Sequence, residues 1–134
     1  MTKTANPPLN VTLQAVFVLF ITSWNALRLY SALRNWQILS EFGASPIYLA
    51  ATGLAWTLAS LWLFRLLWEG RSTAQKAALA LAGLYFLWYW VDRLVIQPSP
   101  APNLLFSSVF STVTLVLFTI NLFLPVSKAF FKKE

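Results

Sequence analysis

Two apolar segments between Pro46 and Gln97, joined by the short link Glu69-Gly70-Arg71-Ser72, constrain the fold of this chain more than any other feature. A helix needs about 20 mainly apolar residues to cross the hydrocarbon core of a bilayer, and each segment has that length. A link this short makes the two helices antiparallel neighbours. The sequence therefore predicts a membrane-spanning helical hairpin.

One further apolar segment lies on each side of the hairpin. The four predicted crossings span residues 9–30, 46–68, 73–96 and 104–124, with Pro125 ending or kinking the last. They occupy nearly the whole chain. The predicted fold is an all-α polytopic membrane protein: one domain, residues 1–134, with four transmembrane helices in an antiparallel bundle.

Residues 28–42 have a different character, with apolar residues recurring every three to four positions and polar residues on the opposite face. This pattern predicts an amphipathic helix lying in the headgroup layer after the first crossing, or a bent continuation of that crossing. We expect a connecting interfacial segment rather than a collar for docking lipids or partners.

Several helix ends can be read from local sequence. Ser45-Pro46 predicts an N-cap followed by proline at the first helical position. Gly43 and Gly70 are expected to stop the helices before them, and Ser72-Thr73-Ala74-Gln75 has a capping-box pattern. The alternate prolines in residues 97–103 predict a stiff, extended link.

Small and bulky residues are segregated along the two hairpin helices. The second crossing begins with Ala51, Ala55 and Ala59 at four-residue steps and ends in large side chains, and the third repeats this order. Small residues allow membrane helices to approach closely. In an antiparallel pair each small stretch can face the other helix's bulky end, which predicts a tight hairpin.

The composition fits lipid rather than water as the solvent. The chain is 58% hydrophobic and 10% charged, whereas soluble domains average about 45–50% and about 25%. The net charge of +6 does not indicate nucleic-acid binding, because the basic residues lie at the ends of apolar segments. In such places they set topology and meet anionic lipid headgroups.

Catalytic and metal chemistry are disfavoured by the residue types. The chain has no Cys and no His, and we find no nucleophile motif and no glycine-rich phosphate loop. Haem, copper and zinc usually rely on imidazole or sulfur ligands. We expect no cofactor, no metal site and no enzymatic activity. The acids are too scattered for a carboxylate cage: Glu41, Glu69, Asp92 and Glu134.

The distribution of basic residues predicts the orientation. Three of them, Arg28, Arg34 and Arg93, lie at one membrane face, although the first two follow the first crossing closely and oppose the assignment. By the positive-inside rule both termini are cytoplasmic in a multi-pass protein of the cell membrane. The opposite face takes seven: Lys3, Arg65, Arg71, Lys76, Lys128, Lys132 and Lys133.

Asp92 is the most informative candidate site residue. It lies about one turn inside the predicted end of the third crossing, where an acid needs a partner. Its neighbour Arg93 projects elsewhere on the helix. Arg28 lies at the same membrane face, so we predict an Asp92–Arg28 ion pair between the first and third crossings. The alternative is a proton or cation site at Asp92.

The remaining candidates are weaker. Arg65 and Glu69 have the spacing of a helical ion pair, and Asn121 is the best candidate for a hydrogen bond between helices. The hydroxyls of the fourth crossing could line a polar path, but such residues are common at close helix contacts. The seven tryptophans could form an aromatic cage for a cation, but most lie at crossing ends, where aromatic belts occur.

Two functions remain open from the sequence. The first is a non-catalytic accessory or scaffold subunit that packs into a larger membrane complex, with lipids and other membrane subunits as partners. The second is a small homo-oligomeric transporter or channel with a polar path near Asp92 and Asn121. An enzyme that acts on lipid ranks third.

Overall fold

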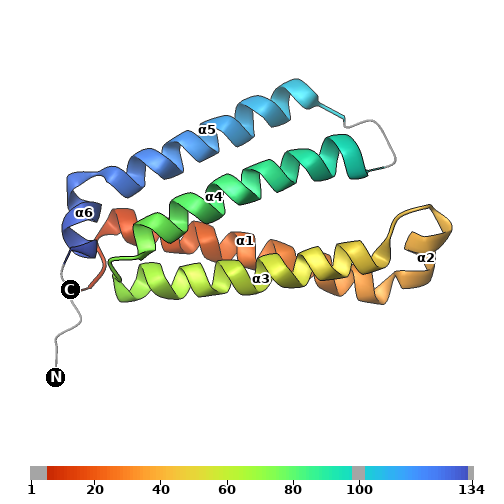
Figure 1. The fold of residues 1–134 in the computed structure, drawn as a ribbon, viewed down its shortest axis with the longest axis horizontal. Helices are drawn as coiled ribbons and strands as arrows, with labels where there is room; N and C mark the ends of the chain where they lie inside the picture. Colours follow the sequence, from red (N-terminus) through yellow and green to blue (C-terminus); the bar gives the residue numbers. More distant parts are fainter. Residues whose placement is uncertain (1–5, 98–101, 133–134) are drawn as a thin grey trace.

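The chain folds into a bundle of helices (Figure 1). The computed structural model describes residues 6–97 and 102–132. Within these residues four helical spans are long and apolar enough to cross a membrane, as predicted: Leu9–Arg34, Pro46–Glu69, Ala74–Ile96 and Leu104–Phe123. In chain order the helices are α1 (Leu9–Arg34), α2 (Trp36–Glu41), α3 (Pro46–Glu69), α4 (Ala74–Val91), the π-helix η1 (Asp92–Ile96), α5 (Leu104–Phe123) and α6 (Pro125–Phe131).

Some sequence predictions fall outside the described residues. Most of the proline-rich link, residues 98–101, is among them, as are Lys3 and Lys133 in the charge count. The described parts place the start of α1, the α3–α4 turn and α6 at one end of the bundle (Figure 1).

The predicted helix ends are largely confirmed. Ser45 is the N-cap of α3, its Oγ accepting a hydrogen bond from the Tyr48 backbone N–H at 3.3 Å. Gly70 ends α3 with φ of +69°, and Gly43 follows α2 with φ of +77°, a region that favours glycine. Helix α4 begins one residue later than the predicted capping box: its N-cap is Thr73, which makes no side-chain cap hydrogen bond, and Gln75 Nε2 donates to a carbonyl of α5.

Residues 28–42 do not form one separate interfacial helix: their first part continues the first crossing, which was the second of the two predicted alternatives. Helix α1 continues to Arg34, because no glycine or proline interrupts its hydrogen bonds before that point. The helix breaks at Asn35, with φ of −104° and ψ of 27°. Only the six-residue helix α2 remains of the separate segment, and none of its residues is buried.

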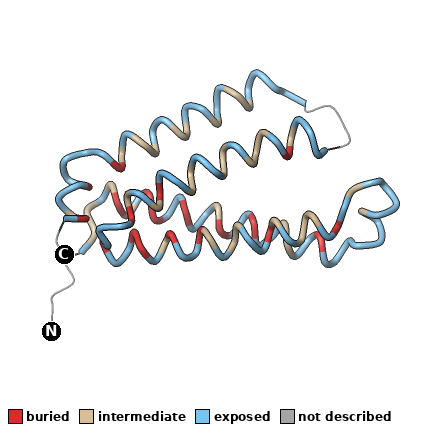
Figure 2. Tube along the Cα trace, in the orientation of Figure 1, coloured by how far each residue is buried: buried red, intermediate tan, exposed pale blue. Residues whose placement is uncertain are grey.

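The closest helix pair is α1 and α3, whereas the tight packing predicted from the sequence was between the hairpin helices α3 and α4. A Cβ atom on Gly53 would lie 3.0 Å from the Leu29 backbone nitrogen, so the two helices touch backbone to backbone. Of the three alanines predicted to mediate contact, Ala51 and Ala55 are exposed and Ala59 is half-buried. Buried positions therefore concentrate on α1 and α3 (Figure 2), and α4 slants away from the pair.

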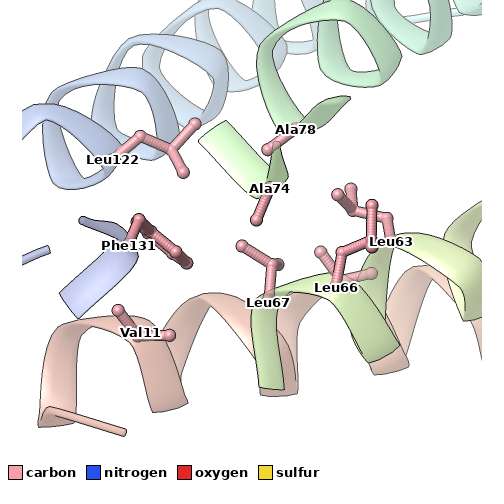
Figure 3. Close-up of a cluster of buried hydrophobic side chains, with 9 residues drawn as sticks. Val11, Leu63, Leu66, Leu67, Ala74, Ala78, Leu122 and Phe131 are labelled. Atoms are coloured by element: carbon pink, nitrogen blue, oxygen red, sulfur yellow. The ribbon is translucent and has the colours of Figure 1, made fainter. Parts of the chain in front are cut away.

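The predicted match of small to bulky residues is present at one end of the hairpin. Ala74 and Ala78, at the start of α4, face leucines from the end of α3 (Figure 3). Their small size lets Leu122 of α5 and Phe131 of α6 reach the same cluster. The fully apolar core therefore lies at the end of the bundle where α6 packs.

Helix α6 returns across the end of the bundle and was not predicted as a helix. Leu124 is extended (φ −59°, ψ 144°), and Pro125 starts the new helix. Because proline lacks an N–H, the Asn121 carbonyl loses its helical donor, and Ser127 Oγ donates to it at 2.8 Å. The next carbonyl, that of Leu122, accepts from Gln75 Nε2 at 2.7 Å.

Candidate functional site

The predicted ion pair between Asp92 and Arg28 is present. Arg28 Nη2 lies 3.2 Å from Asp92 Oδ1. The same oxygen accepts from the Tyr48 hydroxyl at 2.8 Å, and Oδ2 accepts from Gln97 Nε2 at 3.0 Å. Asp92 is only 4% exposed. The carboxylate therefore joins α1, α3 and η1, with both oxygens hydrogen-bonded and its charge opposed by a guanidinium.

Aromatic side chains surround this ion pair. The Arg28 guanidinium lies 4.9 Å from the centre of the Trp88 ring, and Trp88 Nε1 donates to the Tyr48 hydroxyl at 3.0 Å. Trp56 and Tyr85 contact each other edge to face at 4.9 Å, and Trp56 packs against Trp88. The cation over the Trp88 ring is thus the chain's own arginine.

The aromatic-belt interpretation fits the other tryptophans better than these two. Trp56 and Trp88 are partly buried in the cluster, as expected for interior packing. Four others are exposed toward the surroundings of the bundle: Trp24, Trp36, Trp62 and Trp68.

The π-helix η1 was not predicted and positions two of the site residues. The Gln97 backbone N–H bonds the Asp92 carbonyl five residues earlier, at 3.0 Å, where an α-helix would use a four-residue step. The wider turn carries the Gln97 side chain back to Asp92 Oδ2. Single π-turns are frequent at functional sites, but no residue type in this segment signals one from sequence alone.

A line of polar side chains on α1 leads into the site and was also missed. Gln14, Thr22 and Asn25 are buried on one face of the helix. Gln14 Nε2 donates to the Phe118 carbonyl at 3.0 Å, and the Thr22 and Ser60 hydroxyls lie 2.9 Å apart. Their spacing, at helical periodicity within an apolar segment, is a signal that could have revealed them.

Two buried polar atoms near the ion pair lack a hydrogen-bond partner within residues 6–97 and 102–132: Asn25 Oδ1 and Arg28 Nε. Asn25 Nδ2 is bonded, donating to the Ile21 carbonyl at 2.9 Å and lying 3.4 Å from the Tyr85 hydroxyl. Orphan atoms of this kind are costly in a protein interior. This side of the cluster therefore retains unused hydrogen-bonding capacity.

The remaining predicted residues do not join the Asp92 cluster. Arg93 projects elsewhere, as expected: it donates to the Tyr89 hydroxyl at 3.1 Å and to the Pro102 carbonyl. Asn121 makes an interhelical hydrogen bond, its Nδ2 lying 3.4 Å from the Asn10 carbonyl at the start of α1. It therefore lies at the opposite end of the bundle from Asp92. The predicted Arg65–Glu69 pair is present at 2.7 Å.

The hydroxyls of α5 mostly bond their own helix. Ser108, Thr114 and Thr119 donate to carbonyls three or four residues earlier, at 2.8–2.9 Å. Such bonds satisfy the hydroxyl within a membrane helix and leave less capacity for lining a path.

The described part of the chain offers few groups for metal chemistry. In residues 6–97 and 102–132, no three His, Cys, Asp or Glu side chains gather in a group that could hold a metal ion. What the Asp92 cluster can do chemically is hold three helices together through a neutralised carboxylate. The chain matches no protein-family model, and searches of curated proteins and of solved structures find no match.

Proposed function

We propose that this chain is a non-catalytic integral membrane protein, an accessory or scaffold subunit that packs into a larger membrane complex. The proposal is carried by Asp92, the most buried acid among the described residues, whose carboxylate is fully hydrogen-bonded within the chain. Both oxygens of Asp92 are occupied by side chains of the same chain. An acid used in this way fixes helix positions and is not available to a substrate.

The outer faces of α4 and α5 support a packing role. In the most apolar 18-residue stretch of each of these two spans, only 6% of the residues are buried within the chain, compared with 22% for α1. Ala80 and Gly83 are exposed on α4, and a Cβ atom on Gly83 would meet nothing within 4 Å. Small residues on an outward face allow a helix of another subunit to approach closely.

A homo-oligomeric transporter or channel is the second candidate. The unpartnered atoms of Asn25 and Arg28 favour it, because they offer hydrogen bonds inside the bundle. It ranks lower because Asp92 and Asn121, its proposed path residues, bond to opposite ends of α1. The hydroxyls between them along α5 mostly bond their own backbone.

The proposed orientation places both termini in the cytoplasm of a cell-membrane protein. Arg28, Arg34 and Arg93 lie at one end of the bundle, and two of them are drawn inward by hydrogen bonds to Asp92 and Tyr89. The positive-inside rule assigns the more basic end to the cytoplasm. Among the described residues that end carries Arg65, Arg71, Lys76, Lys128 and Lys132.

Native mass spectrometry of the chain, extracted from its own membrane in mild detergent, tests this function. The accessory role predicts a complex with other subunits at fixed stoichiometry. Gly83→Leu, which adds bulk to the outer face of α4, should release those subunits. Ala26→Leu places the same side chain at an exposed position of α1 and should leave the complex intact.

One result would overturn the accessory role, and another would overturn the α4 face as its contact. A homo-oligomer of defined size, with no other subunit, would favour the transporter or channel. Loss of the complex in both variants to the same extent would show that the α4 face is not the contact. Circular dichroism of each purified variant checks that its helices are retained.

A further inference from the structure

The outer face of α3 carries a shallow, open hollow of about 490 Å³. Most of its lining is apolar and includes Leu58, Leu61, Trp62 and Trp68. Arg65 and Glu69 also line it, toward the end of the helix. It therefore combines a long apolar surface with charged groups at the level where α3 ends.

A second hollow, of about 270 Å³, adjoins the first and is more charged. The two share Trp62, Arg65 and Glu69, and the second adds Arg71. Arg65 Nε and Arg71 Nε each bond a different oxygen of the Glu69 carboxylate, both at 2.7 Å. Two guanidiniums thus share one carboxylate, which leaves a net charge of +1.

Both guanidinium groups remain accessible. The side chain of Arg65 is 76% exposed and that of Arg71 is 53% exposed. Because Glu69 is engaged through Nε of each arginine, their forked ends can meet a further anion. Arginine suits phosphate especially well, since its planar fork matches two phosphate oxygens.

The hollow has the depth of one membrane leaflet. Leu58 and Glu69 are eleven residues apart, which is about 16 Å along a helix that rises about 1.5 Å per residue. Half of a hydrocarbon core about 30 Å thick is about 15 Å. Glu69 is the last residue of α3, so the hollow runs from the headgroup level to about the middle of the bilayer.

We propose that this surface binds one anionic phospholipid. Its acyl chain lies along Leu58 and Trp62, and its phosphate meets Arg65 and Arg71. The net positive charge of the pocket selects a headgroup without a compensating cation. A transmembrane helix of a partner would match the apolar part of the surface, but the accessible arginines call for an anion at headgroup depth.

Native mass spectrometry of the purified chain in detergent, titrated with dioleoyl phosphatidylglycerol or dioleoyl phosphatidylcholine, tests the site. The two lipids share their chains and differ in headgroup charge. We expect one phosphatidylglycerol to be retained per chain, more tightly than phosphatidylcholine. An arginine near an anionic lipid surface contributes a factor of about five, so R65Q/R71Q should lower the affinity about 25-fold.

Glu69→Gln separates lipid binding from a merely structural ion pair. It removes the competing carboxylate and should raise the affinity for phosphatidylglycerol about five-fold, whereas a structural ion pair predicts weaker binding by both R65Q/R71Q and Glu69→Gln. Arg34→Gln is the matched control, because Arg34 is an exposed arginine at the other end of the bundle. It should leave binding unchanged.

The apolar part of the hollow is tested separately. Trp62→Ser should weaken both lipids by a similar factor, and glycerol phosphate without chains should not bind measurably. The proposal is overturned by equal affinity for the two lipids, by R65Q/R71Q binding like Arg34→Gln, or by Glu69→Gln binding more weakly. Full binding by Trp62→Ser, or tight binding of glycerol phosphate, would equally overturn it.

Discussion

Breaking the Arg28–Asp92 ion pair from either side should destabilise the bundle, and breaking it from both sides should cost less than the sum. Removing one partner of a buried pair costs about 3–5 kcal/mol, because the surviving charge stays in a medium of low dielectric. The side chain of Arg28 is 21% exposed, compared with 5% for the side chain of Asp92. Asp92→Asn leaves the more exposed ion, which can extend toward the headgroups, so we expect a loss of about 2 kcal/mol.

Arg28→Gln leaves the more deeply buried ion. Asp92 keeps its hydrogen bonds from Tyr48 and Gln97, which offset part of the loss, and we expect about 3 kcal/mol. In the double variant no charge is stranded, so its loss should be about 3 kcal/mol rather than 5. The expected coupling free energy is therefore about 2 kcal/mol.

Equilibrium unfolding in mixed micelles, followed by tryptophan fluorescence, measures these free energies. The wild type, both single variants and the double variant complete the cycle. If the two single losses add to the double loss within about 0.5 kcal/mol, the residues are not coupled. An Arg28→Gln variant as stable as the wild type, beside a destabilised Asp92→Asn, would likewise refute the pairing.

Four further variants test other contacts by the same unfolding measurement. Tyr48→Phe removes a donor to the carboxylate and the acceptor of the Trp88 indole N–H, so it should cost about 2 kcal/mol; no loss would mean that the hydroxyl is not needed. Gly53→Ala pushes a methyl against backbone and should cost about 1–3 kcal/mol, whereas Gly83→Ala, in open space within a helix, should be neutral or stabilise by up to about 1 kcal/mol. Equal effects of the two alanines would contradict the close approach of α1 and α3. Ser127→Ala leaves the carbonyl at the α5–α6 break without its donor and should cost about 1 kcal/mol; an unchanged stability would show that water or lipid headgroups replace the bond.

Features that depend on neighbouring residues, or on position along a single helix, could be predicted from the sequence. Span length and hydropathy predict the four long helices, because a membrane leaves a backbone few alternatives to the helix. Ser45 and Gly70 predict helix ends through their backbone preferences. The Asp92–Arg28 pair was predicted from membrane depth, because an acid inside the membrane needs a cation at the same depth.

Features that depend on three-dimensional packing were not predictable in this way. The alanine row and Gly53 both offered a small surface on α3, and only the packed structure distinguishes them: Gly53 touches α1, while Ala51 and Ala55 point outward. The π-turn at Asp92 has no residue signature. Helix α6 was missed because Pro125 signals an end, but does not reveal whether a new helix follows.

The hydrogen bonds from Gln14 and Gln75 to α5 end on backbone carbonyls, those of Phe118 and Leu122. A carbonyl is supplied by every amino acid, so α5 can exchange its side chains without giving up either link. The two glutamines have no such freedom, because each provides the amide that makes the bond. Apart from Leu122, which is packed in the apolar core, α5 should therefore tolerate far more sequence variety than these two donors.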